Sequence, residues 1–540
     1  MRKICAAIVA MTVFAASSYA QTWEDALTFS DTDNAGTARS IGMGNAVTAV
    51  GGDLGSIVFN PAGSAVSSFS QFELTNGVSI VTSNAEGTVF DDGSVPGFQD
   101  PTKTSIGRYK LPNIAFMLVM DSFRKRGLKS FTMGLVGNAT QDYSLKYTST
   151  GTNDRTSFAA AMASDAAGWP VATMNKDYYD ANGPSWRSLN AYKAGLFNPI
   201  TGRDGDYVAA TERIRDDGQC EVPDVLNQGY GFRRTGYKYD WAWNMAANVS
   251  DVFYFGGNIN LSVLRYRGDT YWKESTDKPS SFPTTFVGED GTSRTDYFEQ
   301  LRMRYAYRAE GGGISAKAGF LWRPFGGLRI GAAIQTPTAM DITETYGYDA
   351  YTVYTDNEYS DSSPSETWEY SMKIPSIVNA GIAYTVGDFL LLSADYEFTN
   401  YGWARFSEIE GPDTGVFTVV NQDIKDNLRA CHTLRAGMEV RPSDTVALRF
   451  GYNFRSNPYK KFEAEGRQNI SFGLGYSSAG SFFADAALRM TFFPVSYITP
   501  YYYYYVDEDG YSVPDLNIVT PEITLTTLRT EVMATIGWRF

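Results

Sequence analysis

The stretch from Tyr237 to Asn248 reads YKYDWAWNMAAN and alternates between two kinds of side chain. Because side chains of a β-strand point alternately to opposite faces, this stretch predicts a strand with one face against an apolar medium. The apolar and aromatic face comprises Tyr237, Tyr239, Trp241, Trp243, Met245 and Ala247, and the polar face comprises Lys238, Asp240, Asn244 and Asn248.

The same alternation recurs along the chain, and the connections between the alternating segments have two lengths. Short turns lie at 250–251, 323–327, 386–388, 441–444 and 477–480, and long polar segments lie near 84–108, 146–236, 269–305, 346–370, 403–430, 456–466 and 496–525. Short turns that alternate with longer loops are typical of transmembrane barrels. The sequence therefore predicts an all-β fold, a transmembrane antiparallel β-barrel of about fourteen strands over residues 71–540, with 146–236 and 269–305 as its main extracellular loops.

Composition excludes other classes of protein. The longest apolar run after the first twenty residues, Ile114 to Met120, is far shorter than the roughly 18 residues of a spanning helix. The formal net charge of −14 disfavours nucleic acid as a partner. We assign no cofactor and no metal ligand.

The first twenty residues predict a secretory signal peptide. Arg2 and Lys3 precede an apolar run that ends at Ala16, and Ser18-Tyr19-Ala20 places small residues at a cleavage site. We expect the mature chain to begin near Gln21 and to be located in the bacterial outer membrane.

Residues 21–70 do not alternate as strands do. They contain TARSIGMGNAV at 37–47 and FNPAG at 59–63. These motifs resemble the start of the FadL/TodX family of outer-membrane transporters, in which an N-terminal hatch plugs a fourteen-stranded barrel. The resemblance implies a hatch over 21–70 and assigns its motif to Gly42, Gly44, Asn60, Pro61, Ala62 and Gly63.

The residues of these motifs have the conformational properties that a hatch needs. Pro61 favours extended geometry at Asn60, and Gly63 is free to take positive φ, so a fixed corner is expected here. Gly42 and Gly44 allow a close approach of the backbone inside a crowded lumen.

The C-terminal half extends the resemblance through GGGISAKAG at 311–319, LRIGAA at 328–333, SADY at 393–396 and LRFGY at 448–452. It implies passive uptake of small hydrophobic molecules such as long-chain fatty acids or aromatic hydrocarbons, with outer-membrane lipid around the barrel. The alternative is a FadL-like surface barrel that binds or shuttles secreted proteins, as the PorV type does. The family also has a lateral gate at a kink of the third strand, which corresponds here to Gly134 and Gly137.

Three further predictions concern single positions. The last strand ends with Trp538 and Phe540, which resembles the signal that the barrel-assembly machinery reads. Cys220 and Cys431 survive signal cleavage, and an oxidising compartment permits a disulfide between them. The single histidine, His432, has no serine motif beside it, so we assign no catalytic residue and predict no enzyme.

Ten charged residues at inward positions are predicted to form ion pairs that hold the hatch to the wall, rather than to bind a ligand directly. They are Lys317, Arg329, Asp395, Glu397, Arg435, Glu439, Arg449, Asp485, Arg489 and Glu531.

Overall fold

The structure is a computed structural model of the 540-residue chain. It describes residues 21–89, 95, 97–176, 183–216, 218–287, 292–409, 414–461, 465–478, 480–502 and 520–540. The predicted signal peptide, residues 1–20, lies outside the described residues.

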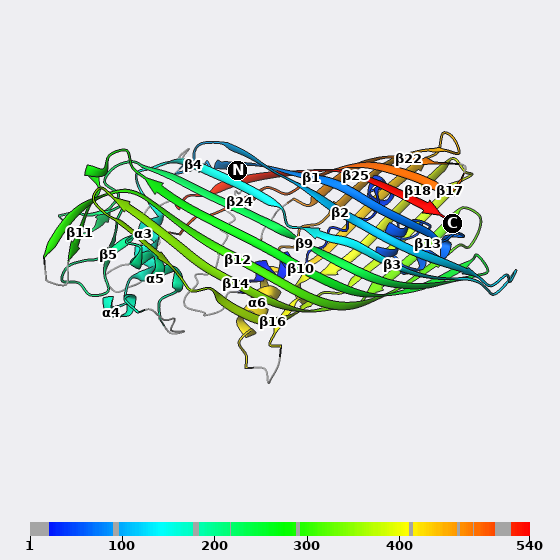
Figure 1. Cartoon of the computed structure of the whole chain (residues 1–540), viewed down its shortest axis with the longest axis horizontal. Helices are drawn as coiled ribbons and strands as arrows, with labels where there is room; N and C mark the ends of the chain where they lie inside the picture. Colours follow the sequence, from blue (N-terminus) through cyan, green and yellow to red (C-terminus); the bar gives the residue numbers. More distant parts are fainter. Residues whose placement is uncertain are drawn as a thin grey trace, which may run out of the picture.

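Fourteen antiparallel pairings close one sheet into a barrel, so each strand of the ring has two neighbours (Figure 1). The predicted fold class is confirmed. In ring order the strands are β1 (Gln71–Gly87), β2 (Thr102–Asp121), β3 (Leu128–Asp142), β9 (Leu226–Val249), β10 (Phe253–Ser275), β12 (Ser293–Trp322), β13 (Leu328–Gln335), β17 (Ile377–Val386), β18 (Leu390–Asn400), β20 (Ala430–Val440), β21 (Val446–Arg455), β22 (Arg467–Ser477), β23 (Phe482–Phe492) and β25 (Ile523–Arg539).

Three strands of the ring continue past an interruption. β3 is followed by β4 (Leu145–Asn153), β13 by β14 (Thr338–Tyr354), and β17 is preceded by β16 (Glu366–Ile374). Pro337 and Pro375 lie at two of these breaks, where a residue without an N–H cannot donate to the ladder. The third break, at Tyr143 and Ser144, has no proline and is described below.

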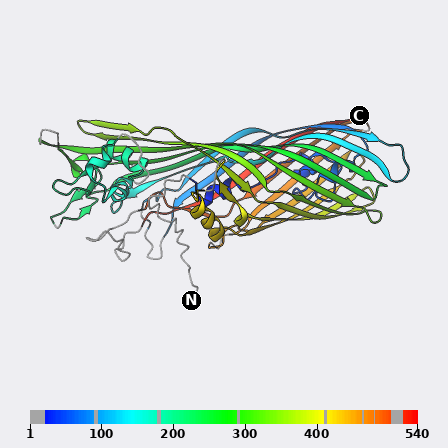
Figure 2. The same cartoon turned by 90° about the horizontal axis from the view of Figure 1, so that it is seen from below.

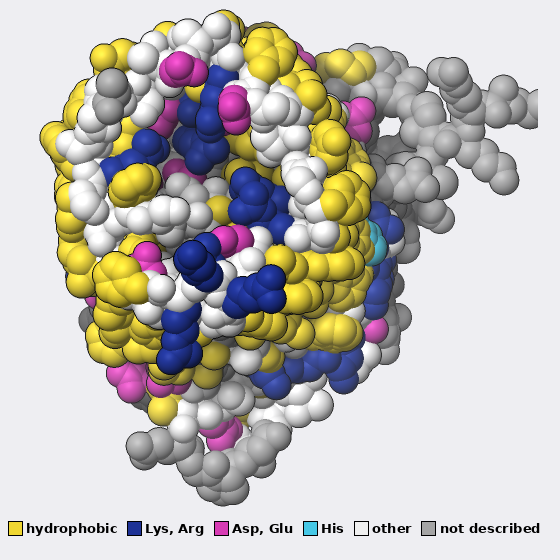
Figure 3. Space-filling view, turned by 90° about the vertical axis from the view of Figure 1, so that its right-hand side faces the viewer, with side chains coloured by type: hydrophobic (Ala, Val, Ile, Leu, Met, Phe, Trp, Pro, Cys, Tyr) yellow, Lys and Arg dark blue, Asp and Glu magenta, His cyan; other side chains and the backbone are white. Residues whose placement is uncertain are grey.

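The outer surface of the barrel carries an apolar belt, which Figure 3 shows around the end with the short turns. In β9, Trp241, Trp243 and Met245 are 40%, 62% and 52% exposed, whereas Asn244 and Asn248 are buried in the lumen. A closed sheet with apolar side chains outside satisfies its backbone internally and spans a bilayer. Among the described residues, no helix is both long and apolar enough to cross a membrane.

All five predicted short turns connect neighbouring strands, and they lie at the end of the barrel where the C-terminus is found (Figure 1). Ser250 and Asp251 both adopt a φ of 59°, a left-handed geometry that suits a tight hairpin. The Asp251 N–H donates to the Asn248 side chain, 2.9 Å away, which stabilises this turn.

The wall is much taller on one side than on the other (Figures 1 and 2). β9, β10 and β12 have 24, 23 and 30 residues, whereas β18, β20 and β22 have 11 each. About ten residues suffice to cross a bilayer in a tilted strand, so the tall side extends beyond the membrane.

The two long loops predicted at 146–236 and 269–305 are therefore wrong in their bounds. β4 and β9 occupy both ends of the first, β10 and β12 occupy most of the second, and β11 (Pro283–Val287) pairs back onto β12. Alternation is lost in these segments because neither face of the strand contacts lipid there, so polar composition resembles that of a loop.

An outer lobe, residues 154–225, packs against the inner face of this extension (Figure 2). Phe158 of the lobe stacks on Trp272 of β10 with ring centroids 5.0 Å apart. The elements of the lobe are α3 (Phe158–Ala166), α4 (Val171–Met174), α5 (Trp186–Lys193), β5 (Phe197–Pro199), β6 (Tyr207–Ala209), β7 (Arg213–Ile214) and β8 (Cys220–Glu221). Smaller outer elements are η3 (Pro279–Ser281), β15 (Glu358–Ser362), η4 (Tyr401–Trp403), β19 (Arg405–Ser407), α6 (Thr418–Asn427) and β24 (Ser496–Ile498).

The N-terminal segment, residues 21–70, lies inside the barrel and appears dark blue in Figure 1. It contacts β2, β3, β9, β10 and β12 on one side of the lumen and β21, β22, β23 and β25 on the other. Its elements are α1 (Trp23–Ser30), α2 (Ala38–Gly42), η1 (Leu54–Val58) and η2 (Pro61–Val66). A capping box between Thr22 and Asp25 begins α1.

Candidate functional site in the barrel lumen

The Asn60-Pro61 corner is hydrogen-bonded both to another part of the N-terminal segment and to the wall. The fully buried Asn60 side chain donates to the carbonyl of Thr48 (2.8 Å) and to that of Phe320 in β12 (3.0 Å). Its oxygen accepts from the Ala62 N–H, which begins η2. The Pro61 carbonyl accepts from Asn244 of β9 (3.0 Å). Two buried amides, of Asn60 and Asn244, thus attach the corner to strands β12 and β9 of the wall.

Two glycines of the segment lie directly against the wall. Gly44 has a φ of 64°, and a Cβ there would be 2.8 Å from the backbone nitrogen of Tyr452 in β21. A Cβ on Gly42 would be 3.0 Å from the Cα of Gly473 in β22. This is the close backbone approach that the sequence predicts. Gly63, by contrast, lies within η2 and does not have the positive φ that we expected, because the turn is made as a 3-10 helix.

Ion pairs connect the segment to the opposite side of the barrel. Asp33 pairs with Arg489 of β23 (3.1 Å) and with Arg529 of β25 (3.3 Å). Arg39 pairs with Glu439 of β20 (3.0 Å). Burial raises the pKa of Asp33, but Arg489 and the neighbouring arginines outweigh it and lower this pKa to about 2. Removing one partner of such a buried pair is strongly destabilising, because the other charge is left uncompensated.

Cationic and acidic side chains of the wall also bind the backbone of the segment. Lys317 donates to the Val58 carbonyl (2.6 Å), Arg329 donates to that of Val50, and Asp395 accepts from the Thr48 N–H (2.8 Å). The other predicted inward charges pair among themselves or with the segment: Arg435 with Glu397, Arg449 with Glu439 and Asp485, and Arg489 with Glu531. Of these ten residues, Glu439 and Arg489 form the predicted ion pairs with the segment. Lys317, Arg329 and Asp395 contact its backbone instead, and the others pair within the wall, so the prediction is met only in part.

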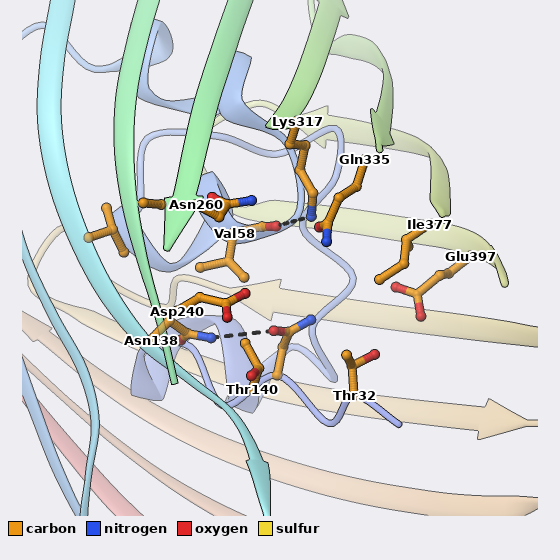
Figure 4. Close-up of a pocket in the computed structure, with 13 residues that line it drawn as sticks. Thr32, Val58, Asn138, Thr140, Asp240, Asn260, Lys317, Gln335, Ile377 and Glu397 are labelled. Atoms are coloured by element: carbon orange, nitrogen blue, oxygen red, sulfur yellow. Dashed lines mark hydrogen bonds between the residues drawn. The ribbon is translucent and has the colours of Figure 1, made fainter. Parts of the chain in front are cut away.

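A small polar cavity lies between the segment and the wall (Figure 4). Its volume is about 30 Å³, which accommodates about two water molecules. Lys317, Asp240 and Glu397 line it, together with several asparagines and threonines. This space is too small for a hydrocarbon, and a hydrocarbon there would deprive the charged and amide side chains of hydrogen-bond partners, so the lumen axis is a poor route for it.

An aromatic cluster lies at α1, on the side toward the taller end of the barrel. Phe29 of α1 meets Tyr266 edge-on with centroids 5.8 Å apart, and Tyr266 in turn meets Tyr143 (5.3 Å) and Tyr307 (5.7 Å). Tyr143 and Tyr307 are 2% and 7% exposed. Side chains from α1 and from strands β10 and β12 therefore form one apolar region inside the barrel.

Tyr143 also marks a gap in the wall. The ladder between β2 and β3 ends at Asn113 and Asn138, and β2 beyond that point has no ladder with β3 or β4 among the described residues. We call the interval between 102–112 and 139–149 the wall gap. Asp142 accepts from the Ser144 N–H (3.0 Å), an Asx turn that ends β3 within this gap.

Side chains, not backbone, close the wall gap in this structure. Thr104 donates to the Lys146 carbonyl (2.8 Å), Lys110 pairs with Asp142 (2.9 Å), and Arg108 donates to the Gly236 carbonyl (3.3 Å). A few separate side-chain contacts break more readily than a continuous backbone ladder, because fewer bonds must be lost together.

The comparisons identify the same architecture in solved structures. The chain is similar to a FadL homologue from Pseudomonas aeruginosa, with a TM-score of 0.50 and 14% identity over 94% of this chain and 98% of the other. The chain has the FadL fold. Two further matches are the toluene transporters TodX of P. putida (TM-score 0.46, 9% identity, 93% and 98% covered) and TbuX of Ralstonia pickettii (0.45, 13%, 93% and 98%). No family model and no curated protein sequence matches the chain.

In this FadL-type barrel, Gly134 and Gly137 lie beside the wall gap and not within it. Gly134 pairs with Met117 and Gly137 with Ile114, both in the part of the ladder that is complete. The interruption lies a few residues further along the chain, at Tyr143 and Ser144. The predicted gate residues therefore border the interruption.

The remaining predicted positions are spread over the molecule. Cys220 and Cys431 are free, which corrects the predicted disulfide: Cys220 lies in a hairpin of the outer lobe, whereas Cys431 is buried in β20. His432 is exposed on the outer face of β20, where its Nδ1 lies 2.8 Å from the Tyr396 hydroxyl. Trp538 packs against Phe482 and Phe72, and so contacts both strands that β25 joins.

Sequence reasoning missed the elements that define the wall gap. Asp142-Tyr143-Ser144 has the composition of an Asx turn, and this local signal could have located the break. Gly236, which faces it on β9, has a φ of 142°, and a Cβ there would be 2.1 Å from the Arg265 carbonyl. A single glycine in a strand does not by itself specify such a position.

Proposed function

We propose that this protein is an outer-membrane channel for passive uptake of small hydrophobic molecules. The observation that carries the proposal is the continuity between the aromatic cluster and the wall gap through Tyr143. An apolar molecule held among these rings would reach the lipid through the gap once the side-chain contacts of Arg108 and Lys110 across it open. The alternative path along the lumen axis passes ion pairs and a small polar cavity.

The N-terminal segment acts in this proposal as the hatch. Its ion pairs and backbone contacts hold it in the lumen, so it need not leave for transport to occur. Movement of α1 would open space within the aromatic cluster, because Phe29 fills the space beside Tyr266. Movement of Arg108 and Lys110 would open the wall gap. The likeness to the P. aeruginosa FadL homologue supports this arrangement of parts.

The ligand class follows from the lining. Aromatic rings with buried hydroxyls suit a compact apolar or weakly polar molecule, such as an aromatic hydrocarbon, and a fatty-acid chain is the other candidate that the resemblance implies.

A crosslink across the wall gap tests the route. In a variant with Cys220→Ser and Cys431→Ser, the pair Thr104→Cys and Lys146→Cys is joined by a short bifunctional thiol reagent. We expect uptake of a fluorescent hydrophobic tracer into proteoliposomes to fall at least about tenfold and to recover when a cleavable crosslinker is cut, because the crosslink prevents the gap from opening.

The matched control places the same crosslink in the complete part of the ladder. Leu118→Cys and Met133→Cys are exposed register partners in the complete ladder between β2 and β3. This crosslink should leave uptake unchanged. Equal uptake with and without the crosslink at 104 and 146 would exclude the lateral route, and no uptake by the uncrosslinked protein would exclude the channel itself.

The outer lobe favours a second candidate, the binding of a secreted protein at the cell surface. It lies beyond the membrane, where it shares an apolar core with the extended strands of the wall. Affinity purification after mild crosslinking in cells discriminates the two functions. A secreted protein recovered in stoichiometric amount, together with absent tracer uptake, would support this candidate over the channel.

A further inference from the structure

The outer face of the tall wall changes chemistry abruptly along β10. The outward residues from Phe253 to Val263 are apolar or glycine, with Ile259, Leu261 and Val263 being 52%, 46% and 39% exposed. The next two outward residues are Arg265 and Arg267. Ten steps of about 3.4 Å along a strand tilted by about 40° rise about 26 Å, which matches the height of the apolar belt of an outer-membrane barrel.

Arg265 and Arg267 thus lie at the level of the lipid headgroups. The neighbouring strands agree with this boundary, since the register places Tyr237 of β9 and Glu310 of β12 beside Arg265. An aromatic side chain such as Tyr237 is typical of the interface. The short turns lie at the opposite end of the barrel, so this is the headgroup level of the outer leaflet in the proposed orientation.

Cationic side chains gather on this face across three strands, which we call the basic patch. Its members are Arg233 of β9, Arg265, Arg267 and Lys273 of β10, and Arg302 and Arg308 of β12. Acidic side chains neutralise only part of it: Arg265 lies 3.9 Å from Glu310, and Asp269 is already paired with Arg304 (2.6 Å). The patch stands out in a chain with a formal net charge of −14.

Two arginines of the patch are directly opposed. Arg267 and Arg308 are register partners on β10 and β12, both are exposed, and neither has an acidic partner among the described residues. Like charges at directly opposite positions destabilise a sheet. An anion bound between them would remove this repulsion, and two guanidinium groups together match the oxygens of a phosphate.

We propose that the basic patch binds the phosphate groups of an outer-leaflet lipid, a phosphorylated glycolipid whose acyl chains lie against the apolar belt below. Arg267 and Arg308 form the centre of the site, and Arg265 lies at its lower edge, where the apolar belt that contacts the acyl chains begins. Cationic residues directly above an apolar wall fit an amphiphile that has an anionic headgroup and acyl chains. A soluble anion would contact only the cationic residues and gain nothing from the apolar wall. This binding is separate from transport.

The test measures lipid retained by the full-length barrel. Purified protein in mild detergent is mixed with bis-phosphorylated lipid A, and retained lipid is counted by native mass spectrometry. We expect Arg267→Gln with Arg308→Gln to reduce the apparent affinity at least about tenfold, because charge-assisted hydrogen bonds are lost. Arg267→Lys with Arg308→Lys should retain an intermediate affinity and the salt dependence, since the charges remain but the bidentate geometry is lost.

Two controls separate headgroup binding from other causes. Arg124→Gln with Lys125→Gln removes the same charge at the short-turn end and should leave retention unchanged. Lipid A treated with phosphatase should bind the wild-type protein and the patch variant equally weakly. The inference is overturned if the patch variant retains phosphorylated lipid A as the wild type does, or if dephosphorylated lipid A binds the wild type as well as the phosphorylated form.

The amount of lipid retained by the barrel does not depend on whether the protein transports a tracer. Heat-modifiable migration confirms that each variant is folded, and tracer uptake by the patch variant should be unchanged. Absence of tracer uptake by the wild-type protein would therefore disprove the proposed function and leave the inference about the lipid site standing.

Discussion

At the scale of single residues, polar side chains and small apolar clusters together attach the N-terminal segment to the wall. A soluble core uses apolar contacts for this purpose, but a wide barrel has a polar interior that must be matched group by group. Asn60 illustrates this, because its amide reaches Thr48 within the segment and Phe320 in the wall. The result is a segment positioned by directional bonds rather than by packing alone.

Asn60→Ala should destabilise the docked segment by about 2 to 4 kcal/mol, because two buried carbonyls lose their donor. Hydrogen exchange of peptides covering 44–66 should rise accordingly, while the barrel strands stay protected. Asn76→Ala, a change on the outer face of β1, serves as the control. Unchanged exchange in the Asn60 variant would show that the corner does not depend on this amide.

The pH dependence of α1 provides a second test at this scale. Burial, and then Glu344, raise the pKa of Asp25 to about 7. Since this pKa is higher in the docked helix than in the exposed chain, docking is favoured at low pH and weakens as pH rises from about 4 to about 7. Exchange of peptide 21–31, corrected for intrinsic rate, should increase from pH 5 to pH 8, and Asp25→Asn should abolish most of this increase. The peptide covering β17, which contains no acidic or basic side chain, serves as an internal reference, and an equal increase in the Asn variant would contradict the assignment.

At the scale of elements, closure of the barrel depends on β25. It pairs with β23 on one side and with β1 on the other, so it closes the ring. The residue that follows it also participates, because the Phe540 N–H donates to the Ser70 carbonyl (2.9 Å). A barrel that lacks the end of this strand has two free edges.

Deletion of Trp538 to Phe540 should therefore prevent assembly. The expected result is a chain that shows no heat-modifiable migration and is degraded by protease in the membrane fraction, because the closing ladder and two aromatic anchors are lost. Trp538→Phe keeps an aromatic anchor and should assemble normally. A protease-resistant barrel from the truncated chain would disprove the assembly signal predicted for Trp538 and Phe540.

At the scale of the whole molecule, the two ends of the barrel differ in height and composition. One end has short turns, and the other has the extended strands and the outer lobe (Figure 1). Long connections face outward and short ones face the periplasm in barrels of this class.

Trypsin should report this orientation on intact cells. It should cleave at exposed Arg203 or Arg213 in the outer lobe and spare Arg124 to Arg126 in the turn between β2 and β3. After permeabilisation of the outer membrane, the turn should become accessible as well. Cleavage at the turn in intact cells would mean that the barrel is inserted the other way.

The sequence by itself determined the features that depend on one strand and its solvent. A period of two with one apolar face, short turns at regular intervals and an aromatic last strand are local properties, so the barrel and its approximate strand number followed from them. The inward charges were found in the same way, whereas the Asn60-Pro61 corner was assigned from the resemblance to the FadL/TodX family. Each of these signals needs no knowledge of which strands are neighbours.

Only the tertiary structure decided the features that depend on pairing. The wall gap exists because β2 and β3 stop sharing a ladder after Asn113 and Asn138. The sequence of neither strand shows where their pairing ends. The strand extensions resemble loops in sequence, because outside the bilayer no face is required to be apolar. The opposition of Arg267 and Arg308 likewise arises from register between two strands. Contacts between residues distant in sequence are set by the closed sheet, and this explains why the proposed route and the proposed lipid site could be argued only from the fold.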